Sequence, residues 1–70
     1  MNEAALPIQL DGRPHAVPAG STLAELVAAL GHAPGAVATA VNGEFVARGL
    51  RDRPLREGDA VVLFQPIVGG

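Results

Sequence analysis

Few side chains in this 70-residue sequence have the types and the spacing that catalysis or metal binding requires. His15 and His32 lie far apart, and neither has a carboxylate or a second histidine at the spacing of metal ligands. Ser21 lacks the histidine and the acid of a nucleophilic triad and is better explained as a helix cap. With no cysteine, the chain has neither a thiolate nucleophile nor a disulfide. The side chains therefore predict no catalytic residue and no metal site.

The acidic residues and the internal glycines also predict no catalytic site. The acidic residues are scattered singly and form no carboxylate pair for acid–base chemistry: Glu3, Asp11, Glu25, Glu44, Asp52, Glu57 and Asp59. Internal glycines such as Gly12 and Gly43 stand where turns and caps need them, and no Gly-rich phosphate loop follows a strand and opens a helix. A reactive group therefore has to be sought on the main chain.

The chain ends in two glycines, and this end is the strongest candidate for a reactive group. The α-carboxylate of Gly70 is ionised at neutral pH and is a poor electrophile, so its chemistry needs activation by another enzyme, for instance by ATP to an acyl-adenylate. Because Gly69 and Gly70 have no side chains, the end can enter a narrow channel and leave the carbonyl open to a nucleophile.

The residues before the glycines favour an extended arm. Pro66, Ile67 and Val68 are each restricted in φ or χ1. From Gln65 to Gly70 such an arm reaches about 20 Å. The alternative is a frayed terminus, but frayed termini are more usually polar than apolar and proline-stiffened. We therefore predict that the chain end is the working part of the protein.

Composition predicts one small domain in the cytoplasm. Net charge is −2, so there is no electrostatic footprint for nucleic acid or an anionic membrane surface. All five basic residues are arginines, and four of them lie between positions 48 and 56. The first residues lack the basic and apolar regions of a signal peptide, and no stretch approaches the roughly 18 apolar residues of a membrane span.

The first half of the chain predicts a hairpin and one helix. Ile8 and Leu10 alternate with polar or small positions, the pair at 11–12 is a strong two-residue turn, and Val17 lies on the returning strand. Thr22 followed three residues later by Glu25 fits a capping box. An apolar stripe at helical spacing follows, and Gly31 ends it: Leu23, Leu26, Val27 and Leu30. A helix this short must pack on a sheet.

The second half predicts three strands. These are a strand at 36–41, a two-residue Asn-Gly turn, a short strand at 44–46, and a last strand at 60–65. In the polar segment between the last two, Leu50 and Leu55 are expected to anchor the loop to the core. The order is that of a β-grasp (ubiquitin-like) fold, an α+β class with a mixed sheet of about five strands and one helix across one face. We predict a domain over 1–64 and a flexible tail over 65–70.

The last strand also predicts a docking surface. Val61 and Leu63 share one face of this strand, and Val62 and Phe64 share the other. Only one face can meet the single helix, so we place Val61 and Leu63 inside and expect Val62 and Phe64 to be exposed. An exposed apolar patch that leads into the tail is a candidate surface for a partner. The alternative is that these are ordinary surface apolar residues.

The whole chain resembles a known family in three stretches: "VNGEFVAR" at 41–48, "LREGDAVVLFQPIVGG" at 55–70 and the helix "GSTLAELVAAL" at 20–30. They are similar to the bacterial sulfur-carrier proteins of thiamine biosynthesis, which are small ubiquitin-like proteins ending in Gly-Gly. Ala47 is a departure, because many members carry proline before the arginine. The resemblance implies that the first and last strands are neighbours at the centre of the sheet.

The resemblance also implies a function in which the protein is a cosubstrate and not an enzyme. An E1-like adenylyltransferase would use ATP and Mg²⁺ to adenylate the Gly70 carboxylate, so no cofactor would be bound permanently. A cysteine desulfurase or other sulfur donor would supply the sulfur of a thiocarboxylate, which thiazole synthase would then use. The tail before Gly70 would consist of Pro66, Ile67, Val68 and Gly69, and the expected partner-binding residues are Val62, Phe64, Gln65 and Arg48. Arg48 matches the arginine of the motif, but it could equally be a solvated loop arginine.

Other functions remain open at this point. The nearest is the related sulfur-carrier subunit of molybdopterin synthase, which is typically somewhat longer and more often ends in "PPV-x-GG". A carrier for tRNA thiolation or cysteine synthesis and a protein conjugator are further alternatives. From a different class, the chain could be a β-grasp interaction module with no covalent role, which would not need its last two glycines.

Overall fold

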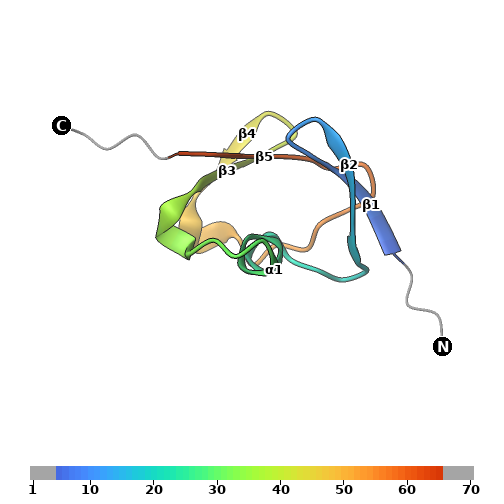
Figure 1. Cartoon of the computed structure of the whole chain (residues 1–70), viewed down its shortest axis with the longest axis horizontal. Helices are drawn as coiled ribbons and strands as arrows, with labels where there is room; N and C mark the ends of the chain where they lie inside the picture. The colour runs from blue at the N-terminus through green and yellow to red at the C-terminus, as the bar shows by residue number, and fades with distance from the viewer. Residues whose placement is uncertain (1–4, 66–70) are drawn as a thin grey trace.

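The structure is a computed structural model that describes residues 5–65, and in it a twisted sheet is covered on one face by a single helix (Figure 1). The five strands lie in the order β2-β1-β5-β3-β4. Only the central pair, β1 and β5, is parallel, and the other neighbours are antiparallel. The elements are β1 (Ala5–Leu10), β2 (Arg13–Pro18), α1 (Leu23–Ala29), η1 (Pro34–Ala36), β3 (Ala38–Val41), β4 (Glu44–Val46), η2 (Arg48–Leu50) and β5 (Ala60–Phe64).

This architecture confirms the predicted β-grasp fold, including the central position of the first and last strands. The third strand begins at Ala38 and not at residue 36, because Pro34–Ala36 form a 3₁₀ turn. The domain prediction placed a tail at 65–70, and residues 66–70 lie outside the described residues. No helix among residues 5–65 is long and apolar enough to cross a membrane.

Two tight turns set the registers of the two hairpins. Asp11 and Gly12 have φ values of 52° and 81°, and Asn42 and Gly43 have values of 54° and 84°. Two successive residues with positive φ form the turn type whose twist matches that of paired strands, and Asn, Asp and Gly tolerate this backbone. The strands then pair from the residues that flank each turn, Leu10 with Arg13 and Val41 with Glu44.

The N-terminus of α1 is closed from two directions. The predicted capping box is present, with the Thr22 N–H donating to Glu25 Oε1 at 2.8 Å and the Glu25 N–H donating to Thr22 Oγ1 at 3.1 Å. The next N–H groups donate to loop carbonyls, Leu23 to Arg53 O at 3.2 Å and Ala24 to Arg51 O at 2.8 Å. Donors that a helix normally leaves free are thereby paired, and the loop between β4 and β5 is held against the helix.

The core lies between α1 and the near face of the sheet. The helical stripe is buried against strand residues that alternate inward: Leu23, Leu26 and Val27 from α1, and Ile8, Val17, Val41 and Val61 from the strands. In the loop between β4 and β5, Leu55 is 4% exposed and packs in this core as predicted. The same prediction for Leu50 is wrong, because Leu50 ends the 3₁₀ turn η2 and is 64% exposed.

Candidate docking face and chain end

The central strand β5 carries the chain toward its C-terminus. Phe64, its last residue, pairs with Ala38 at the start of β3, and exposed Gln65 follows it. The predicted modified residue Gly70 and the predicted tail residues lie outside the described residues: Pro66, Ile67, Val68 and Gly69. The site that the structure describes is therefore the surface around the end of β5.

The side chains of β5 alternate between the two faces of the sheet as predicted. Val61 is fully buried, and Leu63 is partly buried against the core. Val62 and Phe64 are each 41% exposed on the opposite side, which we call the outer face. The pairing also places Val62 opposite Ala40 and Phe64 opposite Ala38, so small neighbours leave the two large side chains open to solvent.

Phe45 is a member of this surface that the sequence reasoning missed. It pairs with Ala40 across the β3–β4 hairpin, and Ala40 pairs in turn with Val62, so the three form one row across the sheet. Phe45 is 67% exposed, more than any other large apolar side chain among residues 5–65. The available signal was that Phe45 and Val46 are neighbours in the predicted strand at 44–46, because neighbours along a strand face opposite sides of the sheet.

The outer face has no charged side chain at any outward strand position among the described residues. Registers and burial assign these positions to small, apolar or amide residues: Pro7, Gln9, Pro14, Ala16, Ala38, Ala40, Phe45, Ala60, Val62 and Phe64. An uncharged sheet face that carries exposed aromatic rings is typical of a surface that a partner covers.

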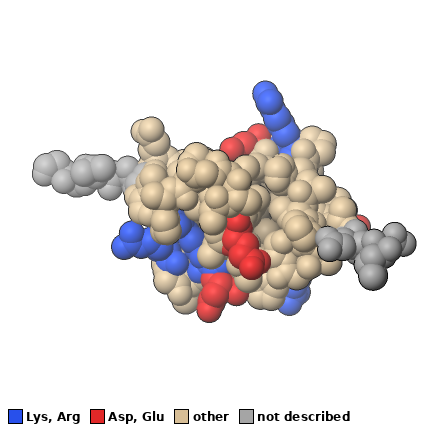
Figure 2. All heavy atoms as spheres, turned by 60° about the horizontal axis from the view of Figure 1, so that its bottom comes forward, with Lys and Arg blue, Asp and Glu red and all other residues tan. Residues whose placement is uncertain are grey.

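Basic side chains gather at the end of the molecule where β5 finishes (Figure 2). Figure 2 shows a group of basic side chains on that side, seen with the helix side brought forward. Arg48, the predicted partner-binding arginine, is exposed at the start of η2. Its Nη1 lies 2.9 Å from the point that a Cβ on Gly35 would occupy, so the guanidinium packs against the backbone of η1.

Arg51 is buried and was not singled out by the sequence reasoning. Only 4% of it is exposed, and its guanidinium donates to Thr39 Oγ1 at 3.1 Å, Pro34 O at 2.8 Å and Val37 O at 2.6 Å. Thr39 in turn donates to Val46 O at 2.9 Å. A buried cation is tolerated when its donors are all engaged, so Arg51 ties η1 to the start of β3.

The two-residue turns at 11–12 and 42–43 are each hydrogen-bonded to the backbone of β5. The Asn42 side chain donates to Asp59 Oδ1 at 3.1 Å and accepts from the Ala60 N–H at 2.9 Å. On the other side of β5, Asp11 Oδ1 accepts from the Leu63 N–H at 3.1 Å. Each two-residue turn therefore supplies a side chain that fixes the backbone of β5.

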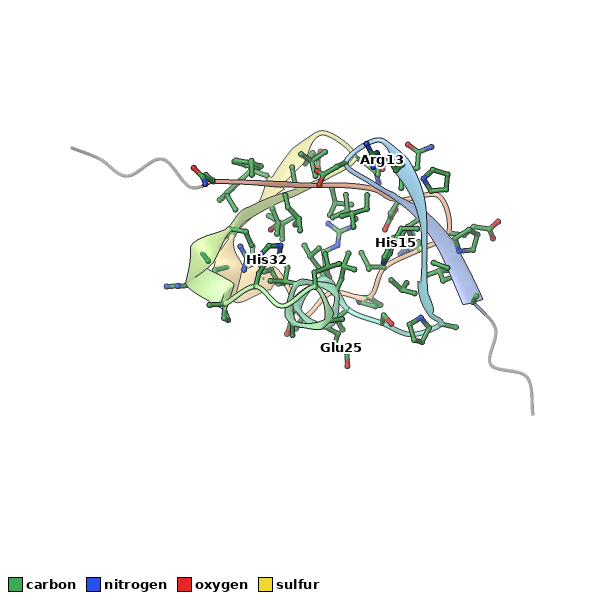
Figure 3. The ribbon with its side chains drawn as sticks, viewed as in Figure 1. Arg13, His15, Glu25 and His32 are labelled. Carbon is green, nitrogen blue, oxygen red and sulfur yellow. The ribbon has the colours of Figure 1, made fainter. Side chains whose placement is uncertain are left out.

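The histidines do not form a site. They lie on different sides of α1 (Figure 3), His15 in a hollow between β2 and the helix and His32 in one between the helix and η1. Within residues 5–65, no three or more His, Cys, Asp or Glu side chains are grouped so that they could hold a metal ion. Neither histidine is brought to the outer face or to the end of β5.

Taken together, these features define a ubiquitin-like β-grasp domain in which the central strand β5 ends beside an uncharged, aromatic face. The model of the ThiS family matches residues 5–70, and the chain belongs to this family. Among solved structures, the chain is similar to a thiamine biosynthesis protein (ThiS) from Geobacter metallireducens. The two are 29% identical with a TM-score of 0.77, and the match covers 93% of this chain and 100% of the other. A search of curated proteins finds no match. The family predicted from the sequence is thus confirmed.

Proposed function

We propose that this protein carries sulfur for the thiazole of thiamine, as a cosubstrate whose reactive group is the Gly70 carboxylate. The observation that carries the proposal is the family match, which extends from residue 5 through the final Gly-Gly. The similar Geobacter protein is described as a thiamine biosynthesis protein, which supports the same pathway.

The proposed chemistry has three steps. An E1-like enzyme with ATP and Mg²⁺ joins the carboxylate to the α-phosphate, and pyrophosphate leaves. A sulfur nucleophile, supplied by a cysteine desulfurase or another donor, then attacks the acyl carbon, and AMP leaves with the former carboxylate oxygen. Where this nucleophile is a persulfide, the acyl disulfide that forms is cleaved by a thiol, which is oxidised to a disulfide as the thiocarboxylate is released. The resulting thiocarboxylate gives its sulfur to the substrate of thiazole synthase, and the carboxylate returns for another cycle. Because the activating enzyme would need ATP, we propose the cytoplasm as the location of this cycle.

The outer face is proposed as the surface that docks to the activating enzyme. Phe45, Val62 and Phe64 offer apolar area without a charge that would have to be desolvated. Aromatic residues at the centre of a contact commonly carry most of its binding energy. Gln65 and Arg48 lie at its margin, where polar contacts orient a partner. Since the tail leaves β5 directly after Phe64, docking on this face would aim the arm into the enzyme.

The test is intact-mass spectrometry of the full chain after incubation with the activating enzyme, ATP, Mg²⁺ and a sulfur source. The expected result is replacement of one carboxylate oxygen of Gly70 by sulfur. A chain that lacks Gly70 is the control and should keep its mass. An unchanged mass of the full chain, with partners shown to be active on another carrier, would refute the proposal.

A non-covalent interaction module makes the opposite prediction, since deletion of Gly69 and Gly70 should leave its function in the cell intact. A carrier for molybdopterin synthase is separated by the auxotrophy that deletion of the gene causes. We expect a requirement for thiamine and normal molybdenum cofactor. The ThiS match favours the thiamine pathway between these two carriers.

A further inference from the structure

A hollow of about 270 Å³ lies at one margin of the outer face, and it has features of a recognition pocket. It is lined by Pro34, Gly35, Val37, Ala38, Phe45, Arg48 and Arg51. Two of these residues, Ala38 and Phe45, also belong to the outer face. A partner that covers the outer face would therefore reach the hollow without a second contact area.

The walls of the hollow are fixed from inside the protein. Buried Arg51 holds Pro34 O and Val37 O, so the η1 side of the hollow cannot relax without breaking two hydrogen bonds to a cation. Gly35 leaves room for the guanidinium of Arg48, since a Cβ there would come within 2.9 Å of Nη1. The guanidinium of exposed Arg48 thus lies against a wall whose backbone is held by Arg51.

The hollow carries positive charge with no acid in its lining. Neither it nor the neighbouring hollow of about 240 Å³, which shares Pro34, Arg48 and Arg51, contains an Asp or a Glu. Of the two arginines that line the hollow, Arg51 donates side-chain hydrogen bonds to other residues within 5–65, and Arg48 donates none to these residues. The guanidinium of Arg48 is the group at this margin that remains available to a ligand.

We propose that the hollow receives an Asp or Glu side chain of the activating enzyme, whose carboxylate accepts hydrogen bonds from Arg48 while the ring of Phe45 covers the pair. This rests on the proposed function and adds the chemistry of the partner to it. A guanidinium binds a carboxylate through two parallel hydrogen bonds, which fixes direction as well as distance. The apolar face would supply contact area, and the hollow would set the orientation of the carrier.

The experiment measures the affinity of the full-length carrier for the activating enzyme by calorimetry, at low and at high salt. Arg48→Glu should weaken binding about tenfold or more at low salt, because two like charges would then meet at the contact. Arg53→Glu is the matched control, since it makes the same charge change in the same loop but does not line the hollow. It should change the affinity by less than about threefold. Equal effects of the two variants would overturn the proposal.

A second variant tests the carboxylate itself. Acidic residues of the enzyme are changed one at a time to Lys, and one of them should restore binding to the Arg48→Glu carrier while weakening binding to the unchanged carrier. If no acidic position does so, the partner group is not a carboxylate and the proposal is wrong. Circular dichroism and the unfolding midpoint should show that each carrier variant is folded.

The outcomes also separate this inference from the proposed function. If the unchanged carrier never gains sulfur at Gly70, the proposed function fails. If it gains sulfur and Arg48→Glu binds like Arg53→Glu, only the hollow proposal fails.

NMR of the free full chain tests whether the chain's own C-terminal carboxylate occupies the hollow instead of a carboxylate of the enzyme. An Arg48 Nε signal that shifts with titration of the Gly70 carboxylate would place the chain's own end in the hollow and overturn the proposal.

Discussion

The two faces of the sheet are made from alternate residues of the same strands, yet they are built for different tasks. The inner face carries Val41, Val61 and other branched residues that are almost fully buried under α1. The outer face carries alanines and prolines around Phe45, Val62 and Phe64, which remain exposed. The difference teaches that alternate residues of β5 supply the buried core on one side and the proposed docking surface on the other.

The largest loss of stability is expected on the inner face. Leu23 is fully buried at the start of α1, so Leu23→Ala should lower the free energy of unfolding by about 2–5 kcal/mol through lost burial and a cavity. Urea unfolding followed by circular dichroism measures this change. Leu50→Ala is the control, because this leucine is exposed, and it should stay within about 0.5 kcal/mol of the parent. Similar losses of unfolding free energy in Leu23→Ala and Leu50→Ala would contradict the contrast between core and surface.

The next effect is expected at the margin between the two faces. Arg51→Met keeps the volume of the side chain but leaves the carbonyls of Pro34 and Val37 without their donor, which should cost about 2 kcal/mol. The same unfolding measurement applies, with exposed Arg53→Met as the control. A variant as stable as the parent would show that water replaces the guanidinium and that Arg51 does not hold the hollow.

A smaller loss is expected at the turn that supports β5. Asn42→Ala forces a residue with a Cβ into positive φ and removes the hydrogen bonds to Asp59 and Ala60, which should cost about 1–2 kcal/mol. Asn42→Gly tolerates the positive φ and removes only the hydrogen bonds. Its free energy of unfolding should therefore lie between those of the parent and of Asn42→Ala. The order of the three unfolding midpoints is the measurement. If Asn42→Gly is no more stable than Asn42→Ala, the positive φ at position 42 makes no contribution to the loss.

The smallest effect on stability is expected on the outer face. Phe64→Asp should change the free energy of unfolding by only about 0.5 kcal/mol, because Phe64 is 41% exposed at the end of β5 and lies opposite an alanine. Its affinity for the activating enzyme should nevertheless fall about tenfold or more, since aromatic residues are frequent centres of binding. Calorimetry measures the affinity, and Leu50→Asp, which adds the same charge away from the face, is the control. Unaltered affinity of Phe64→Asp would remove the outer face from the docking proposal.

Features that depend on neighbouring residues were predicted well from the sequence. Both two-residue turns, the capping box at Thr22 and the inward and outward alternation of β5 follow from backbone preferences and side-chain periodicity within a few positions. The β-grasp order and the central pairing of β1 with β5 came partly from family resemblance, because the pairing joins distant segments.

The features that were missed depend on contacts between distant segments. Leu50 and Leu55 look alike in the sequence, but the 3₁₀ turn η2 directs one outward while the other reaches the core. Among four arginines in one loop, only the fold decides that Arg51 meets Thr39, Pro34 and Val37.

The sequence by itself determined the turns, the cap, the faces of β5 and the family, because each is encoded by residue types at short spacing or by motifs read together. The tertiary structure decided which apolar residues share the outer face, which arginine is buried, and where Arg48 stands beside Gly35. The physical reason is that burial and hydrogen-bond partners belong to the packed arrangement of β3, η1 and η2, and no local preference specifies that arrangement.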